Sequence, residues 1–277
     1  MPRLTLTLDS QQVSAFADCE MYYYLKFVLK IEKKELKASL RRGLHLHNLL
    51  YLFYTGKLKK QSFEQCISRG LRYLRLIGKR WPSEDFMLMA RKYSEYCAYY
   101  RSENIQPLAL EQGFSKILYE DPWHLFIYEG RIDFIGKFPT DRVRYWVDHK
   151  SESRKEDLNQ CSFQFLGYSW GLSTTNGLIN YIGFQQGKGP ADAFRRTIVN
   201  HTYDNIQDWK ENVTQYYFRI ANAQSHKYYA KNRNTCKPYS CSQCQYYELC
   251  EQTNPRKRDA IIRNDFVTRI KPWSAWE

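Results

Sequence analysis

The sequence predicts a mixed fold, α+β or α/β, in which a central sheet follows a helical N-terminal part. Apolar residues recur with helical spacing through roughly the first hundred residues. From about residue 107 onward they alternate or cluster in short runs, as β-strands do. The chain has 277 residues, 43% of them hydrophobic, which suffices for a core in one large or two small domains.

The helical part is expected to contain helices over 10–25, 39–56, 62–78 and 84–102. Ser10 is a suitable N-cap for the first of these helices, and Gly56 is a suitable stop for the second. The Trp81-Pro82 pair separates the last two helices, because proline interrupts helical structure.

The sheet part is expected to begin with three consecutive antiparallel strands, over 109–119, 124–137 and 143–150. A helix over 157–171, strands near 177–186 and 193–201, and a helix over 204–227 follow. The tail from residue 231 carries a cluster of cysteines. We therefore expect three parts: a helical part (1–105), a sheet core (106–230) and a C-terminal region (231–277).

Basic residues outnumber acidic ones, 42 against 29, for a net charge of +13. This excess suits a polyanionic partner such as nucleic acid; the alternative is a basic surface that serves only solubility. No stretch approaches the roughly 18 uninterrupted apolar residues of a membrane span, and the N-terminus lacks a secretory apolar run. We therefore expect a cytoplasmic protein with no membrane partner, whose eight cysteines are metal ligands or buried thiols.

Asp133, Asp148 and Lys150 are expected to converge at one place on the predicted sheet. Asp148 and Lys150 share a strand face because strand side chains alternate with a period of two, and Asp133 lies on the preceding strand. Two carboxylates can hold a hard divalent cation that activates water, and a lysine can offset developing negative charge. The pattern therefore indicates metal-dependent phosphodiester cleavage. The tripeptide Asp148-His149-Lys150 by itself would be interpreted as ordinary surface charge.

Two predicted helices supply further candidates. Gln164 and Tyr168 are four residues apart on one helix face, where they could orient a substrate phosphate or the attacking water, or simply form the rim of an amphipathic helix. His47 is a candidate metal ligand through its neutral imidazole, although a lone helical histidine is usually structural. Gly43, one turn earlier, would let another backbone approach, and His45 would point away from His47.

The C-terminal cysteines form the densest motif of the chain. Cys241, Cys244 and Cys250 supply three closely spaced soft ligands, and a fourth must come from elsewhere. Four thiolates suit either zinc or an iron–sulfur cluster, and spacing does not choose between them. Cys236 is a local candidate for the fourth ligand.

Six short motifs occur in a fixed order along the chain: Ser10 to Tyr22 with Cys19, Gly43 to His47, Gly130 to Asp133, Asp148 to Lys150, Gln164 to Tyr168, and Cys241 to Cys250. In this order they resemble the motifs of the RecB-like branch of the PD-(D/E)XK nuclease superfamily. The likeness is greatest to its iron–sulfur members: the CRISPR-associated RecB-like nucleases, the AddB nuclease domain and related phage exonucleases. Glu111 resembles an acidic position on the strand before the hairpin.

The resemblance implies a restriction-endonuclease-like α/β fold, with a central mixed sheet flanked by helices, a helical N-terminal part and a C-terminal iron–sulfur region. It implies that a [4Fe–4S] cluster is held by four cysteines, namely Cys19, Cys241, Cys244 and Cys250, with Cys236 as the open alternative to Cys19. It implies that Mg²⁺ or Mn²⁺ is bound by His47, Asp133, Asp148 and the backbone carbonyl of His149. Lys150 would be the catalytic lysine, with Gln164 and Tyr168 beside it. Asp148 departs from the commoner Glu, which shortens the side chain by one methylene and keeps its charge.

The expected function is a metal-dependent deoxyribonuclease, an exonuclease on DNA ends or single-stranded DNA. One alternative is a DNA-end-processing or DNA-binding subunit of a larger recombination, repair or CRISPR-adaptation assembly, which would bring a protein partner. Another is a zinc-stabilised nucleic-acid-binding module with an inactive core, against which the joint presence of Asp133, Asp148 and Lys150 speaks. Candidate DNA contacts are the basic residues Lys33, Lys34, Arg41, Arg42, Arg195 and Arg196.

Overall fold

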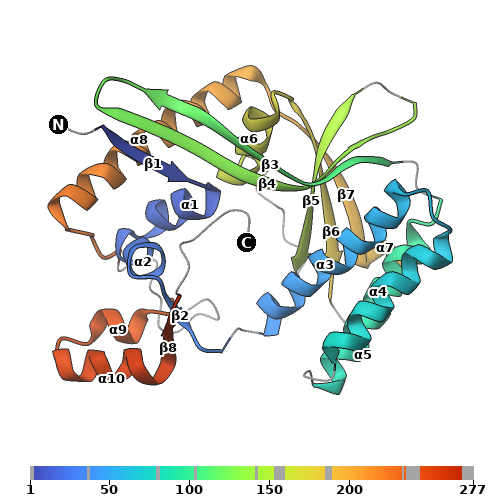
Figure 1. Cartoon of the computed structure of the whole chain (residues 1–277), viewed down its shortest axis with the longest axis horizontal. Coiled ribbons are helices and arrows are strands. Elements are labelled where there is room, and N and C mark those ends of the chain that lie inside the picture. Colours follow the sequence, from blue (N-terminus) through green and yellow to red (C-terminus); the bar gives the residue numbers. More distant parts are fainter. Residues whose placement is uncertain are drawn as a thin grey trace. The chain divides into compact units, whose positions relative to one another are not determined.

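The computed structural model describes residues 3–35, 38–78, 82–102, 105–140, 143–152, 160–184, 189–232, 234 and 244–269. They fall into two compact units that do not follow sequence order. Unit 1 comprises Met1–Leu36, Ser115–Gly130 and Asp204–Glu277, and unit 2 comprises Lys37–Phe114 and Arg131–Tyr203. Strands β3 (Gln106–Glu120) and β4 (His124–Lys137) pass from one unit into the other (Figure 1). The three sequential parts expected from the sequence are a different division and remain a prediction.

Unit 2 is built on a mixed sheet. β4 pairs antiparallel with β5 (Arg144–Glu152), β5 pairs parallel with β6 (Asn176–Gly183), and β6 pairs antiparallel with β7 (Phe194–Asn200). A parallel pair needs a long crossover, and α6 (Phe163–Leu172) lies in the connection from β5 to β6. The expected mixed α/β fold, a central mixed sheet flanked by helices, is thereby confirmed.

Helix α6 begins later than the sequence predicted. Ser162 is its N-cap, since the side chain accepts a hydrogen bond from the backbone N–H of Phe165. The first residues of the predicted helix, 157–159, lie outside the described residues. The N-cap fixes where the face bearing Gln164 and Tyr168 starts.

Three long helices accompany this sheet: α3 (Ala38–Leu58), α4 (Phe63–Ile77) and α5 (Ser83–Tyr99), followed later in the chain by the short α7 (Pro190–Ala193). Helix α3 packs against β5, and α4 and α5 pack against α3 (Figure 1). The predicted stop at Gly56 is wrong, because α3 continues to Leu58. Gly56 is buried inside the helix, where a Cβ would lie 2.5 Å from Cys66 Sγ, so this glycine permits close packing with α4.

Unit 1 contains β1 (Leu4–Leu8), which pairs parallel with the first half of β4, from Leu4 opposite His124 to Leu8 opposite Tyr128. Helices α1 (Ser10–Asp18) and α2 (Glu20–Tyr23) and the π-helix η1 (Tyr24–Val28) follow. The N-cap of α1 is Asp9 and not Ser10, because Asp9 accepts a hydrogen bond from the backbone N–H of Gln12. The long helix α8 (Tyr203–His226) covers these strands, with Tyr217 OH donating to Ile127 O.

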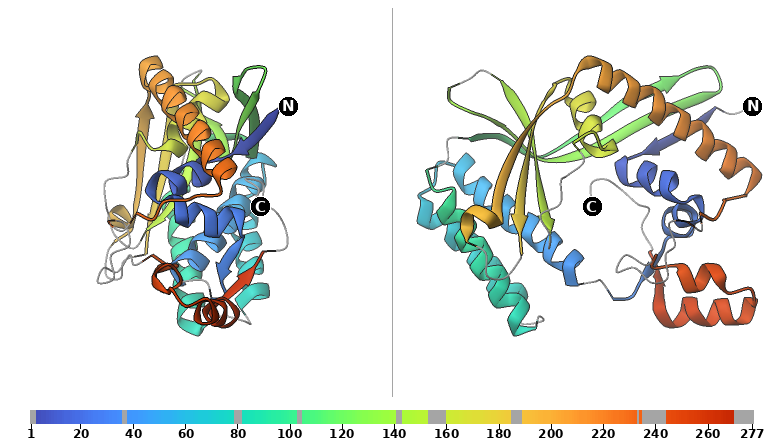
Figure 2. Two further views of the ribbon diagram at one scale, coloured as in Figure 1. Left: turned by 90° about the vertical axis from the view of Figure 1, so that its left-hand side faces the viewer. Right: turned by 180° about the vertical axis from the view of Figure 1, so that it is seen from behind.

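The end of the chain folds back onto its beginning within unit 1. β2 (Ile31–Lys33) pairs antiparallel with β8 (Phe266–Thr268). Helices α9 (Tyr247–Glu251) and α10 (Pro255–Asp265), coloured red, lie side by side next to this pair (Figure 2). Among the described residues, no helix combines the length and the apolar character that a membrane span requires.

Candidate active site

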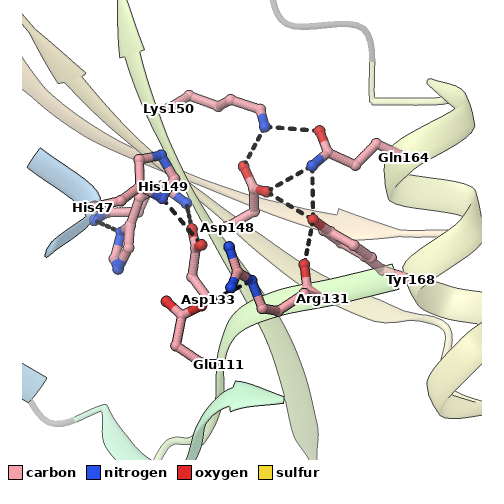
Figure 3. A network of polar contacts seen from close by, with 10 residues as sticks. His47, Glu111, Arg131, Asp133, Asp148, His149, Lys150, Gln164 and Tyr168 are labelled. Atoms are coloured by element: carbon pink, nitrogen blue, oxygen red, sulfur yellow. Dashed lines mark hydrogen bonds and ion pairs between the residues drawn. The ribbon is translucent and has the colours of Figure 1, made fainter. Parts of the chain in front are cut away.

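The two central strands of unit 2 bring the predicted carboxylates together. Phe134 on β4 is opposite Val147 on β5, so Asp133 and Asp148 are adjacent across the antiparallel pair. The Asp148 side chain is 2% exposed and that of Asp133 is 16% exposed. Two carboxylates are thus held close together in a largely dry environment (Figure 3).

Lys150, Gln164 and Tyr168 surround the Asp148 carboxylate, as Figure 3 shows. Lys150 Nζ lies 2.7 Å from Asp148 Oδ2 and donates to Gln164 Oε1 at 2.8 Å. Gln164 Nε2 donates to Tyr168 OH at 2.7 Å and to Asp148 Oδ1 at 3.3 Å. Tyr168 OH in turn donates to the carbonyl of Arg131 on β4 at 2.9 Å. The side chains of β5 and α6 that were predicted from the sequence to lie in the site therefore form one connected network.

His47 reaches the other carboxylate from α3. Its Nδ1 lies 3.1 Å from Asp133 Oδ1, while Asp133 Oδ2 accepts a hydrogen bond from the backbone N–H of His149 at 2.6 Å. Gly43 allows this approach of α3 to β5, since a Cβ there would lie 2.9 Å from Ser151 Oγ. His45 faces away from His47, as predicted, with its Nδ1 2.8 Å from a tyrosine hydroxyl on α4.

The two carboxylates have opposite pKa shifts. Burial raises the pKa of Asp148; the charge of Lys150 opposes this shift, and the charge of Asp133 adds to it. Burial would also raise the pKa of Asp133, but the charge and hydrogen bond of His47 outweigh burial and hold that pKa well below its usual range. Asp133 is therefore the firmly ionised member of the pair.

The two histidines of the site also differ. Burial would lower the pKa of His47, but the Asp133 carboxylate raises it to about 9, so this imidazole carries a proton at neutral pH. Burial lowers the pKa of His149 to about 4, so its imidazole is neutral. His47 would have to lose this proton before its Nδ1 or Nε2 could bind a cation.

Glu111 on β3 lies beside these groups (Figure 3). It has a left-handed backbone conformation, with φ of 47°, which is uncommon for a residue other than glycine. Its carboxylate pairs with Arg131 Nε at 3.0 Å. Burial, together with the charge of Asp133, raises the pKa of Glu111. The strand thus adopts an unusual local conformation where it presents a third carboxylate to the site.

The donor atoms of the site suit a hard divalent cation. Asp148 Oδ2 is buried and lies 2.7 Å from the Lys150 ammonium group. Carboxylate oxygens, a backbone carbonyl and an imidazole are all ligands that such ions accept. In the arrangement seen, these groups bond to one another, and the described part of the chain contains no set of three or more His, Cys, Asp or Glu side chains poised around a metal position.

A buried polar network behind β5 was missed from the sequence. Asn180 on β6 is opposite His149 in the parallel pair, and its Nδ2 donates to His149 Nδ1 at 2.7 Å. Its Oδ1 accepts from Arg196 Nε on β7 at 3.2 Å. Because Asn180 donates to Nδ1, the neutral imidazole of His149 carries its proton on Nε2. The sequence does contain a signal for this network, because Asn180 interrupts the apolar run from Leu178 to Ile182.

Tyrosine hydroxyls complete this network. Arg196 donates from its NH2 group to Tyr54 OH at 3.0 Å and to Tyr96 OH at 3.2 Å. Its guanidinium also lies 3.7 Å from the centre of the Tyr100 ring. The prediction that Arg196 contacts DNA is therefore wrong, because the side chain is turned into the core.

The other predicted DNA contacts remain predictions. Arg41 and Arg42 both pair with Asp85 of α5, at 3.1 and 3.0 Å. Lys34 donates from Nζ to the carbonyl of Arg263 at 2.8 Å.

Three of the predicted cluster cysteines lie in the described part of unit 1. Cys19 is buried, and its sulfur accepts the backbone N–H of Asn232 at 3.4 Å. Cys244 and Cys250 are half-buried beside the apolar group around Tyr246 and Leu249. Cys236 and Cys241 fall outside the described residues, so the expected four-cysteine set remains a prediction.

The sequence profile of the PD-(D/E)XK nuclease superfamily matches residues 10–251 of the chain. The comparison with curated proteins gave no match to this chain. Among solved structures, a putative exonuclease from Eubacterium rectale is similar with a TM-score of 0.56 and 11% identity, over 90% of this chain and 89% of that one. SSO0001 is similar with a TM-score of 0.36 and 14% identity, over 65% of this chain and 76% of that one. At 11% identity, the likeness to the Eubacterium rectale protein shows a shared fold.

Proposed function

Because the chain belongs to the PD-(D/E)XK nuclease superfamily, we propose that it is a Mg²⁺- or Mn²⁺-dependent deoxyribonuclease. It would hydrolyse phosphodiester bonds as an exonuclease on DNA ends or single-stranded DNA. The observation that carries the proposal is the network around Asp148, in which Lys150 contacts one carboxylate oxygen and Gln164 contacts the other. The net charge of +13 supports a polyanionic substrate.

The residues of the site would divide the chemistry among them. His47, Asp133, Asp148 and the backbone carbonyl of His149 would hold the ion, which when bound would lower the pKa of a water and neutralise phosphate charge. Lys150 would offset the charge that develops around the phosphate in the transition state. Gln164 accepts a hydrogen bond from Lys150 and donates one to Asp148, so it would hold the lysine and the carboxylate in a fixed orientation.

Cleavage of end-labelled single- and double-stranded DNA in Mg²⁺ or Mn²⁺ tests this proposal. Asp133→Ala, Asp148→Ala and Lys150→Ala should each abolish cleavage and leave DNA binding largely intact, because they remove few phosphate contacts. Gln164→Ala should reduce cleavage about 10- to 100-fold, the usual effect of losing a partner of a metal ligand. Asp259→Asn, on the exposed side of α10, should retain full activity. Full activity in Asp148→Ala would contradict the assignment.

We further propose that Cys19, Cys241, Cys244 and Cys250 hold a [4Fe–4S] cluster. Two observations support Cys19: it is buried, and its sulfur accepts a backbone N–H, a contact that iron–sulfur clusters commonly receive. Iron and sulfide analysis of anaerobically purified protein tests the metal. A colourless protein with bound zinc would instead support a zinc-stabilised region.

The proposed reaction also has a consequence for the location of the protein in the cell, because the enzyme must meet DNA. A deoxyribonuclease of this kind would act on DNA in the cytoplasm of a bacterial, archaeal or phage-infected cell. The thiolate ligands of the proposed cluster are consistent with a reducing compartment.

A further inference from the structure

One face of α3 is exposed and apolar. Leu40, Leu44, Tyr51 and Leu58 are 61%, 54%, 42% and 42% exposed. At 100° per residue these side chains lie within an arc of about 60° on the helix, and His47 lies within the same arc. The solvent-facing side of a helix usually carries charged residues, so an apolar row there is a candidate for contact with a partner.

The arginine and lysine side chains of α3 lie on its other sides. Arg41 and Arg42 point toward Asp85 on α5, with which both make ion pairs. Lys57 lies over the rings of Phe53 and Tyr54, which belong to the buried side of the helix. In a protein with a net charge of +13, the four side chains of this face are uncharged, and His47 lies at its edge. The face is therefore suited to uncharged ring surfaces more than to phosphates.

The apolar face continues directly from the candidate active site. Leu44 and Tyr51 are three residues before and four residues after His47, which makes them its neighbours along the helix surface. His47 itself contacts Asp133. A polynucleotide with its scissile phosphate at Asp133 and Asp148 would therefore place its next nucleotides over Leu44 and Tyr51.

We propose that this face of α3, formed by Leu40, Leu44, Tyr51 and Leu58 and called here the base-contact face, binds unstacked nucleobases on both sides of the scissile phosphodiester. The inference rests on the proposed nuclease function and names its substrate as single-stranded DNA, including frayed duplex ends. Base rings stack on aromatic and apolar side chains with little sequence preference. In an intact duplex those rings are stacked on one another, so the face has nothing to contact.

Binding of fluorescent oligomers in EDTA tests the face without any cleavage. Wild-type protein should bind an oligothymidylate more tightly than a duplex or an abasic oligomer of equal length. Leu44→Ala and Tyr51→Ala should each weaken oligothymidylate binding about five-fold or more, the loss typical of one base contact. Binding of the abasic oligomer should not change, and Tyr51→Phe should restore binding because it keeps the ring.

Matched controls separate this effect from a general loss of apolar surface. Leu76→Ala on α4 and Tyr203→Ala at the start of α8 remove side chains that are 73% and 83% exposed elsewhere, and both should bind like the wild type. Equal weakening for the normal and the abasic oligomer would overturn the proposal. So would unchanged oligomer binding together with a shift from dimer to monomer in Leu44→Ala, which would mean that a second copy covers the face.

Cleavage kinetics keep this inference distinct from the proposed function. With Mg²⁺ and single-stranded DNA, Leu44→Ala and Tyr51→Ala should raise KM and leave kcat nearly unchanged, because neither residue touches the proposed ion. A wild-type protein that binds the oligomer selectively but cleaves nothing would contradict the nuclease function alone. Cleavage with unaltered KM in both variants would contradict the base-contact face alone.

Discussion

At the scale of single residues, His47 and Asp133 form a charged pair whose ionisation depends on the fold. The folded protein raises the pKa of His47 to about 9 from an ordinary value of 6.5, so the folded state binds the proton more tightly than the unfolded state. The stability that this contributes is complete below pH 6.5 and is lost as pH rises through 9. A cation bound by His47, as proposed, would have the opposite dependence, because it would compete with the His47 proton.

We therefore predict two opposite pH trends between pH 6.5 and 9. In EDTA, the contribution of His47 to the free energy of unfolding should fall as pH rises, because the His47–Asp133 ion pair is lost. The additional stabilisation by Mn²⁺ should grow over the same range, because deprotonated His47 becomes available as a ligand. Urea unfolding at several pH values, with and without Mn²⁺, measures both trends.

His47→Gln is the control for this prediction. The variant keeps a polar side chain near Asp133 but does not titrate, so its stability in EDTA should vary less between pH 6.5 and 9. The range starts at pH 6.5 because His149 affects stability below that value. The pKa of His149 is lowered to about 4, so the protein loses stability as pH falls from 6.5 toward 4. An unchanged slope in His47→Gln would assign the titration to another group.

The positions of the site residues could be predicted from the sequence better than their ionisation could. Strand and helix periods place Asp148 with Lys150 and Gln164 with Tyr168, because these pairs are local. The charge of His47 depends on Asp133, which is 86 residues away along the chain. The assignment of Arg196 to DNA failed for the same reason, since its tyrosine and asparagine partners come from α3, α5 and β6.

At the scale of elements, β5 is supported from β6 and β7. Asn180 links His149, next to Asp148, to the Arg196 guanidinium. Because the backbone N–H of His149 donates to Asp133, a shift of this residue would alter both carboxylates of the site. Asn180 is thus a positioning residue for the proposed ion site.

We predict that Asn180→Leu weakens Mn²⁺ binding about 10- to 100-fold, as is usual when a second-layer partner of a ligand is lost. The unfolding free energy should also fall by about 1–3 kcal/mol, because the Nε–H of Arg196 loses its acceptor. Asn180→Asp keeps an acceptor for Arg196 and should recover part of the stability. Asn176→Leu, at the start of the same strand, is the control. If stability falls but Mn²⁺ affinity measured by calorimetry does not, Asn180 supports the fold without positioning the site.

The packing of β6 on β5 leads to a second prediction at this scale. Gly177 is opposite Trp146, and a Cβ on Gly177 would lie 2.0 Å from the Trp146 ring. That ring cannot move easily, since it is fully buried, stacks on Phe165 and donates to Ser169 Oγ. Gly177→Ala should therefore destabilise the protein by about 1–3 kcal/mol through overpacking. Thermal unfolding measures the loss.

Gly189→Ala is the matched control for Gly177→Ala. A Cβ at Gly189 meets no atom of the described residues within 4 Å, and both substitutions reduce the entropy of the unfolded chain alike. The difference between the two variants therefore isolates the clash with Trp146. Similar melting temperatures for both would show that the sheet adjusts around the new methyl group.

The elements that were predicted are those whose pattern is local. Ser62 and Gln65 form a capping box at the start of α4, and the helix begins where the sequence placed it. β1 and β8 were not predicted, because they are short and pair with strands more than a hundred residues distant. Gly56 looked like a stop because only its contact with Cys66 explains a glycine inside α3.

At the scale of the whole molecule, unit 1 joins the two ends of the described chain. β2 pairs with β8, and Tyr246 OH donates to the carbonyl of Ile31. A metal cluster bound by Cys19 and the C-terminal cysteines would add a covalent link between the same two ends of the chain. Treated like a disulfide across a loop of more than two hundred residues, this link would remove about 5 kcal/mol of denatured-state entropy. That amount is comparable to the total stability of many domains.

We predict that Cys19→Ser releases the iron, bleaches the protein and lowers its melting temperature by more than any substitution of an exposed cysteine. Nuclease activity should fall with it, although Cys19 lies in unit 1 and Asp133 and Asp148 lie in unit 2, because the loss is one of stability and not of chemistry at the sulfur. Cys161→Ser, at an exposed position, should keep colour, melting temperature and activity. Iron content, the visible spectrum and thermal unfolding measure these effects. If Cys19→Ser remains brown and active while Cys236→Ser bleaches, all cluster ligands are C-terminal, and the cluster does not link the two ends of the chain.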